Sequence, residues 1–77
     1  MINIKEHLMN STIFLVAALS MQSGVQITPM NSMNQCISVR DSIYEQVNKN
    51  IWMSIDKEQM WCYNSNTKVK LFVGEKE

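Results

Sequence analysis

The chain has 77 residues, two cysteines and a formal net charge of zero, with seven acidic and seven basic side chains. Without a basic patch, neither nucleic acid nor an anionic membrane is expected as an electrostatic partner. All charged side chains lie at positions 5–6 or from position 40 onward, so residues 8–39 carry no charge.

The charge-free segment contains an unbroken apolar run over residues 13–19, behind a short polar leader. A membrane-spanning helix needs about 20 apolar residues, so this run is too short to be a typical span. A short apolar run behind a leader is typical of an export signal, and the small residues Ala18 and Ser20 favour cleavage before Met21. We predict a signal peptide over residues 1–20; the alternatives are an uncleaved anchor and a retained apolar helix.

Cleavage after Ser20 would leave 57 of the 77 residues, a size that usually needs a disulfide, a metal or a partner for stability. Cys36 and Cys62 are the only cysteines, and an even count in an exported chain predicts one disulfide. It would close a loop of about 27 residues and stabilise the fold by about 3.5 kcal/mol. The alternative is a pair of buried free thiols. Zinc is not expected, because His7 is the only histidine and two thiols do not complete a four-ligand site.

After a linker predicted over residues 21–31, which holds the single proline Pro29, the domain is expected over residues 32–77. Ser32 and Gln35 fit a capping box at the start of a helix. The following apolar residues recur at spacings of three and four, which predicts a helix over residues 33–48. This stripe consists of Cys36, Val39, Ile43 and Val47.

The C-terminal third changes to the period of a strand. Strands are predicted over residues 51–55, 60–63 and 68–73, with polar turns at 56–59 and 64–66. The competing interpretation makes residues 54–61 a short second helix. The predicted fold class is α+β: one helix packed on a three-stranded antiparallel sheet, with a helix-to-strand disulfide.

No constellation of residues predicts an enzyme. Beyond the leader there is no histidine, and Asp41 and Glu45, one helical turn apart, are typical of a solvated surface pair. With only Gly24 and Gly74, there is no glycine-rich phosphate loop. We predict no catalytic residue, no bound metal and no cofactor.

The aromatic residues of the predicted strands are better candidates for contact with a partner. Trp52 alternates with the apolar residues Ile51 and Met53, and Phe72 alternates with Leu71 and Val73, so both are expected on the side of the sheet away from the core. Exposed aromatic residues are enriched at binding surfaces. We predict Trp52 and Phe72 as contact residues. In the alternative interpretation, the small core uses both tryptophans.

The second tryptophan, Trp61, precedes Cys62 directly. If its ring packs at the disulfide, its removal is expected to cost more stability than removal of Trp52.

The run over residues 29–36, together with Arg40-Asp41 and Trp61-Cys62, is similar to short phage-encoded exported proteins with one cysteine pair. The resemblance covers residues 29–62 and implies export and phage origin, without an activity. We therefore expect an exported, non-enzymatic binding domain of the bacterial envelope, periplasmic or secreted, with a protein partner. The alternatives are a structural virion component that keeps its N-terminal helix and a membrane-acting lysis peptide.

Overall fold

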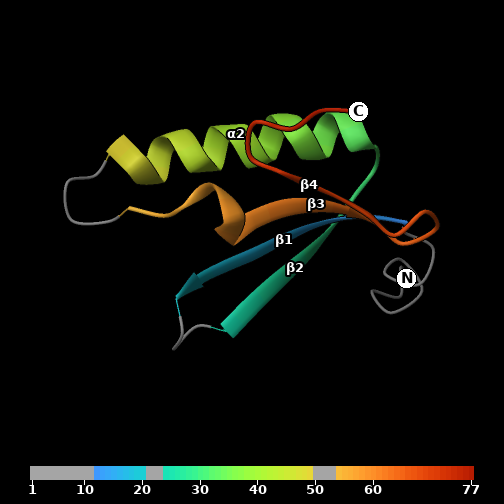
Figure 1. The fold of residues 1–77 in the computed structure, drawn as a ribbon, viewed down its shortest axis with the longest axis horizontal. Coiled ribbons are helices and arrows are strands. Elements are labelled where there is room, and N and C mark those ends of the chain that lie inside the picture. The colour runs from blue at the N-terminus through green and yellow to red at the C-terminus, as the bar shows by residue number, and fades with distance from the viewer. Residues whose placement is uncertain (1–11, 21–23, 50–53) are drawn as a thin grey trace, which may run out of the picture.

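The computed structural model describes residues 12–20, 24–49 and 54–77, and within them one helix lies across one face of a four-stranded antiparallel sheet (Figure 1). The order of the strands in the sheet is β2-β1-β3-β4. The α+β class and the helix-to-strand disulfide are confirmed. The elements in chain order are β1 (Ile13–Ser20), β2 (Gly24–Met30), α2 (Met33–Lys49), the 3-10 turn η1 (Lys57–Gln59), β3 (Met60–Asn64) and β4 (Val69–Phe72).

The sheet has four strands where the sequence predicted three, because two strands come from segments that were assigned other roles. The apolar run is not a helix but forms most of β1, which lies between β2 and β3 and pairs with both. Most of the segment assigned to a linker is the edge strand β2. A short run that is apolar at every position suits a central strand, whose side chains meet apolar neighbours on both faces of the sheet.

Signal cleavage is not tested by the structure and stays a prediction. It has a structural consequence, however, because a cut after Ser20 would remove the whole of β1. β2 would then lose its partner strand, and β3 would keep a neighbour only on the β4 side. The fold described here therefore requires that residues 13–20 remain attached.

The C-terminal hairpin agrees with the prediction, but the segment before it does not. Ser54 and Ile55, expected at the end of a strand, lie outside any regular element, and residues 51–53 lie outside the described part of the chain. The second-helix alternative is wrong, because only Lys57–Gln59 form a 3-10 turn and Met60 already begins β3. The β3–β4 turn forms around Asn64, whose Oδ1 accepts the backbone N–H of Asn66 at 2.9 Å.

The helix α2 matches its predicted range within one residue at its C-terminal end. Its N-terminus is capped by Ser32, whose Oγ accepts the N–H of Gln35 at 3.1 Å. Gln35 Oε1 accepts the N–H of Asn31 at 2.8 Å, one residue before the partner that a standard capping box would use. Across the described ranges, no helix combines the length and the apolar character needed to cross a membrane.

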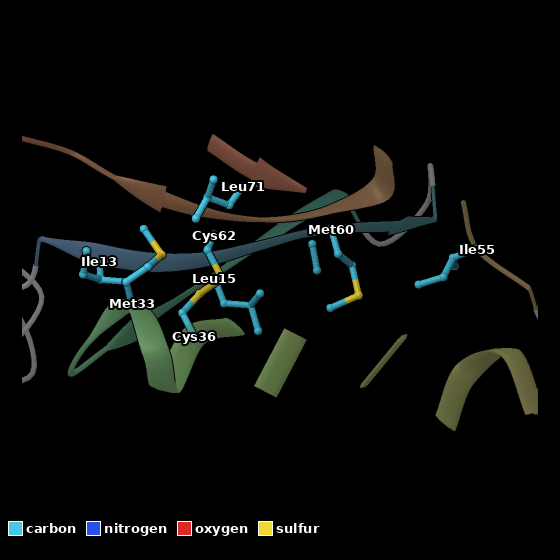
Figure 2. Packing of buried hydrophobic residues seen from close by; sticks show 9 residues of the cluster. Ile13, Leu15, Met33, Cys36, Ile55, Met60, Cys62 and Leu71 are labelled. Carbon is cyan, nitrogen blue, oxygen red and sulfur yellow. A yellow bond between two sulfur atoms is a disulfide. The ribbon is translucent and has the colours of Figure 1, made fainter. Parts of the chain in front are cut away.

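The core lies between α2 and the sheet, with the disulfide at its centre (Figure 2). Cys36 of α2 and Cys62 of β3 are fully buried, and their Cα atoms are 6.0 Å apart. Leu15 lies opposite Cys62 in the β1–β3 ladder, and Leu71 lies opposite Cys62 in the β3–β4 ladder. The buried cluster consists of Ile13, Leu15, Ala17, Met33, Cys36, Ile55, Met60, Cys62 and Leu71.

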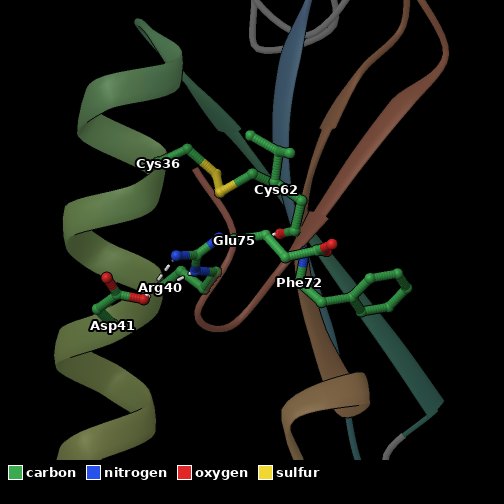
Figure 3. Close-up of polar contacts among 7 residues, drawn as sticks. Cys36, Arg40, Asp41, Cys62, Phe72 and Glu75 are labelled. Carbon is green, nitrogen blue, oxygen red and sulfur yellow. Dashed lines mark hydrogen bonds and ion pairs between the residues drawn. A yellow bond between two sulfur atoms is a disulfide. The ribbon is translucent and has the colours of Figure 1, made fainter. Parts of the chain in front are cut away.

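A buried arginine joins α2 to β4 beside the disulfide (Figure 3). Arg40, which the sequence places at the flank of the apolar stripe, is fully buried, and its Nη1 donates to the carbonyl oxygen of Leu71 at 3.0 Å. Its Nε donates to Oδ1 of Asp41 at 2.8 Å. Nη2 is also 2.8 Å from that oxygen, but the alignment makes this contact an ion pair without a hydrogen bond. The helix thus buries a cation whose counter-ion, Asp41, is half-exposed.

Candidate interaction surface

The two faces of the sheet have different surroundings. Side chains alternate between the faces along each strand, so Leu15, Cys62 and Leu71 point to α2 while their chain neighbours point to the opposite side. No element among the described residues packs on that opposite side, and Figure 3 shows Phe72 pointing away from α2. This side of the sheet is therefore the candidate surface, and we call it the open face.

The open face consists of two rows of side chains that cross all four strands. In an antiparallel sheet, directly opposed residues have neighbouring side chains on the same face. The first row is Ile27, Val16, Trp61 and Phe72, and the second is Pro29, Phe14, Tyr63 and Lys70. Seven of these eight side chains are apolar or aromatic, and only Lys70 carries a charge.

The aromatic rings at the β3–β4 end of the open face pack against each other. The ring centroids of Trp61 and Phe72 are 5.5 Å apart, with an angle of 49° between the ring planes. Lys70 Nζ lies 5.6 Å from the centroid of the Trp61 ring, within the range of a cation–π contact. The two rings and the lysine therefore form one contiguous cluster on the open face.

Val16 shows that the open face has some packing of its own. It lies outside the buried cluster between α2 and the sheet, yet it is only 7% exposed. Its cross-strand neighbours are Trp61 on one side and Ile27 on the other. Ile27 is 62% exposed, whereas Trp61 and Phe72 are half-buried. The tryptophan thus shields the sheet while part of it remains accessible.

The structure separates the predicted site residues. Cys36 and Cys62 form the disulfide in the core. Phe72 lies on the open face next to the buried Leu71, as the alternation predicts, and its role in binding stays a prediction. The other predicted contact residue, Trp52, lies outside the described residues.

Trp61 requires a correction. Its position next to Cys62 suggested packing of its ring at the disulfide, but adjacent strand residues face opposite sides, so Cys62 points to α2 and Trp61 to the open face. Phe14 and Val16 were missed entirely, because their segment was assigned to a signal peptide. Their alternation with Ile13 and Leu15 is hidden in the sequence, since every residue of this run is apolar.

The acidic pair of the helix lies on a different side of the molecule. Asp41 and Glu45 border a hollow of about 320 Å³, together with Tyr44, Lys57, Val73 and Gly74. Asp41 is already paired with Arg40. Among the described residues, no group of three or more His, Cys, Asp or Glu side chains gathers at metal-binding distance. None of the residues bordering this hollow belongs to the two rows of the open face.

Comparisons of the chain with protein-family models, curated proteins and solved structures gave no match. The resemblance to phage-encoded exported proteins is therefore still a prediction. Any proposal about function rests on the open face and on the disulfide.

Proposed function

We propose that this protein is a small exported, non-enzymatic interaction domain of the bacterial envelope that binds a protein partner through the open face. The observation that carries this proposal is the pair of apolar and aromatic rows that no described element covers. Contiguous apolar surface of this kind marks interaction sites in small proteins, because water contact with it is unfavourable.

The residue types on the open face fit binding better than general solubility. Trp61, Tyr63 and Phe72 offer large contact areas and have few rotatable bonds to immobilise. Lys70 is the single charge in the two rows and lies beside the Trp61 ring. The partner surface expected from this chemistry is apolar, with a carboxylate at the edge that meets Lys70.

The disulfide supports the part of the proposal that places the protein outside the cytosol. Disulfides persist in oxidising environments such as the periplasm or the extracellular medium and are rare in the cytosol. The proposal keeps residues 13–20 in the working protein, because β1 supplies Phe14 and Val16 to the open face and Ile13 and Leu15 to the core.

One alternative is favoured by a specific observation. A structural virion component, phage-encoded as the resemblance implies, would keep its N-terminal segment, and Ile13–Ser20 are an integral strand of this sheet. In this version the retained segment is a strand instead of the expected helix. Fractionation separates the two candidates, since an envelope protein is recovered with membranes or periplasm and a virion component with purified particles.

The test compares partner capture by matched variants. Wild-type chain, a double variant (Trp61→Ala with Phe72→Ala) and the control Tyr44→Ala are expressed, and partners are fixed with an amine-reactive cross-linker in intact cells. Tyr44 is a half-buried aromatic residue on α2 and does not belong to the open face. We expect a cross-linked species that contains a foreign protein with the wild type and with Tyr44→Ala, and its loss from the double variant.

Equal capture by all three proteins would contradict the proposal. The variants are first compared by thermal unfolding, so that loss of capture is not confused with loss of folding. If the double variant unfolds, Phe72→Ala alone is used, because Phe72 lies on the short edge strand β4 and supports less of the sheet than Trp61 does.

A further inference from the structure

The strand β2 is an edge strand whose surroundings are unusually open. It pairs with β1 on one side, and none of the described elements pairs with it on the other. Five of its seven residues, Gly24 to Thr28, are exposed. Val25 and Ile27 are 58% and 62% exposed. An edge strand with free backbone groups and exposed apolar side chains readily pairs with another strand.

Two of the usual protections of an edge strand, charge and shortness, are absent from β2, and the register irregularity of the β1–β2 pair has its extra residue in β1, between Ala17 and Ser20. Natural edge strands carry charged residues, especially lysine, or proline, or are kept very short. β2 is seven residues long and has no charged residue, and its only proline, Pro29, stands near one end. The opposite edge differs, because β4 is four residues long and carries Lys70, with Lys68 directly before it. The contrast singles out β2 as the edge that is available for pairing.

Pro29 determines which backbone groups face outward. Along an antiparallel strand, alternate residues direct their N–H and C=O groups to opposite sides. Pro29 stays in register opposite Phe14 although it has no N–H to donate to β1. A backbone N–H at this position would therefore point to the outer side of β2, away from β1. By alternation, Ile27 and Val25 direct both N–H and C=O outward.

We propose that a second copy of this chain adds to the sheet through β2, which pairs antiparallel with β2 of the first copy about a two-fold axis at Gln26. In this register Val25 of each copy lies opposite Ile27 of the other, and each donates and accepts a backbone hydrogen bond. Both are residues with an N–H, and Pro29 stays outside the paired segment. The exposed side chains of Val25 and Ile27 then pack against each other across the axis.

Three features favour a second copy over a foreign strand. The pairing is self-complementary, because the same two residues supply both sides of the contact, as a two-fold interface requires. The strand brings no charge to the axis, so two copies do not repel each other there. No described element lies along the outer edge of β2, so none of them blocks the sheet of the other copy (Figure 1).

The first experiment is sedimentation equilibrium of the full, oxidised chain over a range of concentrations. A dimer with a dissociation constant of about 100 µM or tighter is expected for an interface of modest size. Ile27→Lys places like charges on both sides of the axis and is expected to weaken the dimer by about ten-fold or more. The control Val69→Lys makes the same change at an exposed valine of the β4 edge and is expected to leave the dimer intact.

A wild-type chain that stays monomeric up to about 500 µM overturns the proposal. Equal weakening by Ile27→Lys and Val69→Lys overturns it as well, because the β2 edge would then have no special role. If Ile27→Lys fails to fold by circular dichroism, Val25→Lys replaces it with the same expectation.

The register is tested by cross-linking. Opposed residues at a position without hydrogen bonds have Cα atoms about 4.5 Å apart, which a disulfide can bridge. Gln26→Cys places a thiol on the axis and is expected to yield a covalent dimer on a non-reducing gel. Thr28→Cys is the control, since in this register Thr28 lies opposite Gly24 of the other copy. The two Thr28 residues are then about 13 Å apart along the strand. Cross-linking of Thr28→Cys without that of Gln26→Cys overturns the assigned axis.

Discussion

At the scale of single residues, the centre of the molecule combines a covalent link with a buried cation. Cys36 and Arg40 lie one turn apart on α2, and through Cys62 and the Leu71 carbonyl they attach the helix to two different strands. Both contacts reach residues that are opposed in the β3–β4 ladder. Helix and hairpin are therefore joined at adjacent points, which fixes how the helix lies on the sheet.

Removal of the disulfide is the first prediction at this scale. Replacement of both cysteines by serine is expected to lower the free energy of unfolding by about 2–4 kcal/mol, mainly because the unfolded chain gains freedom. Urea unfolding of the wild type and the double variant measures the difference. Free thiols found on alkylation of the denatured, non-reduced wild type would contradict the presence of the bond.

A second prediction contrasts the two partners of the ion pair. Asp41→Ala leaves the guanidinium of Arg40 buried without a counter-ion and is expected to destabilise by about 3 kcal/mol or more. Arg40→Met removes the buried charge, leaves the half-exposed Asp41 to water, and loses one hydrogen bond to Leu71, for about 1–3 kcal/mol. Urea unfolding should rank Asp41→Ala as the more destabilising change; the reverse order would show that the arginine contributes mainly through its contacts with β4.

At the scale of elements, β1 is the strand on which the others depend. It pairs with β2 on one side and β3 on the other, and Gln59 of η1 donates from Nε2 to the Ala18 carbonyl at 2.9 Å. The turn of the β3–β4 hairpin contacts the residue directly before β1, because the Ser65 N–H donates to the Thr12 carbonyl at 2.9 Å. Contacts from β2 and from the C-terminal third of the chain thus converge on the segment that resembles an export signal.

The prediction at this scale concerns truncation. A chain without residues 1–20 is expected to lose cooperative unfolding, because β2 and β3 no longer share a neighbour and the core loses Ile13, Leu15 and Ala17. Far-UV circular dichroism during a thermal melt measures this, with the full chain as control. Intact mass of the protein recovered from cells is the companion measurement: a stable, folded species that begins at Met21 would contradict the requirement for β1.

The sequence predicted the elements whose pattern is local and missed those whose pattern depends on distant partners. The helix follows from its apolar stripe and the Ser32 cap, and the hairpin follows from the alternation before and after Asn64. In β1 every residue of the run is apolar, so no alternation distinguishes a strand from a signal. In β2 the apolar residues are interspersed with Gly24, Gln26, Thr28 and Pro29, which gives the composition of a linker, and pairing with β1 overrides that local preference. Phe72 was predicted from the sequence to lie on this face. The residues that β1 and β2 supply to the open face were not, because neither segment was predicted as a strand.

At the scale of the whole molecule, the two faces of the sheet differ in how deeply their side chains are buried. The face toward α2 holds the disulfide and the fully buried side chains, and the open face holds half-buried rings and exposed aliphatic residues. Charges are also unevenly distributed, since β1 and β2 carry none and all described charged residues belong to α2 and the segments after it.

The prediction at this scale compares equivalent truncations on the two faces. Leu15→Ala, on the helix side, is expected to lower the free energy of unfolding by about 2–4 kcal/mol, because it leaves a cavity beside the disulfide. Phe72→Ala, on the open face, is expected to lower it by about 1 kcal/mol, because the ring is already partly in water. Urea unfolding of both variants decides the point, and an equal loss would mean that the open face is a second core.

The position of the disulfide in the chain also determines how the protein responds to proteases. Cys36 and Cys62 close a covalent ring that contains most of α2, all of η1 and the start of β3, while the β1–β2 hairpin lies outside it. Lys49 and Lys57 are exposed and both fall inside the ring. A trypsin cut at either lysine would add the mass of one water but release no fragment until the protein is reduced. An intact band on a non-reducing gel is therefore compatible with a chain that has been cut.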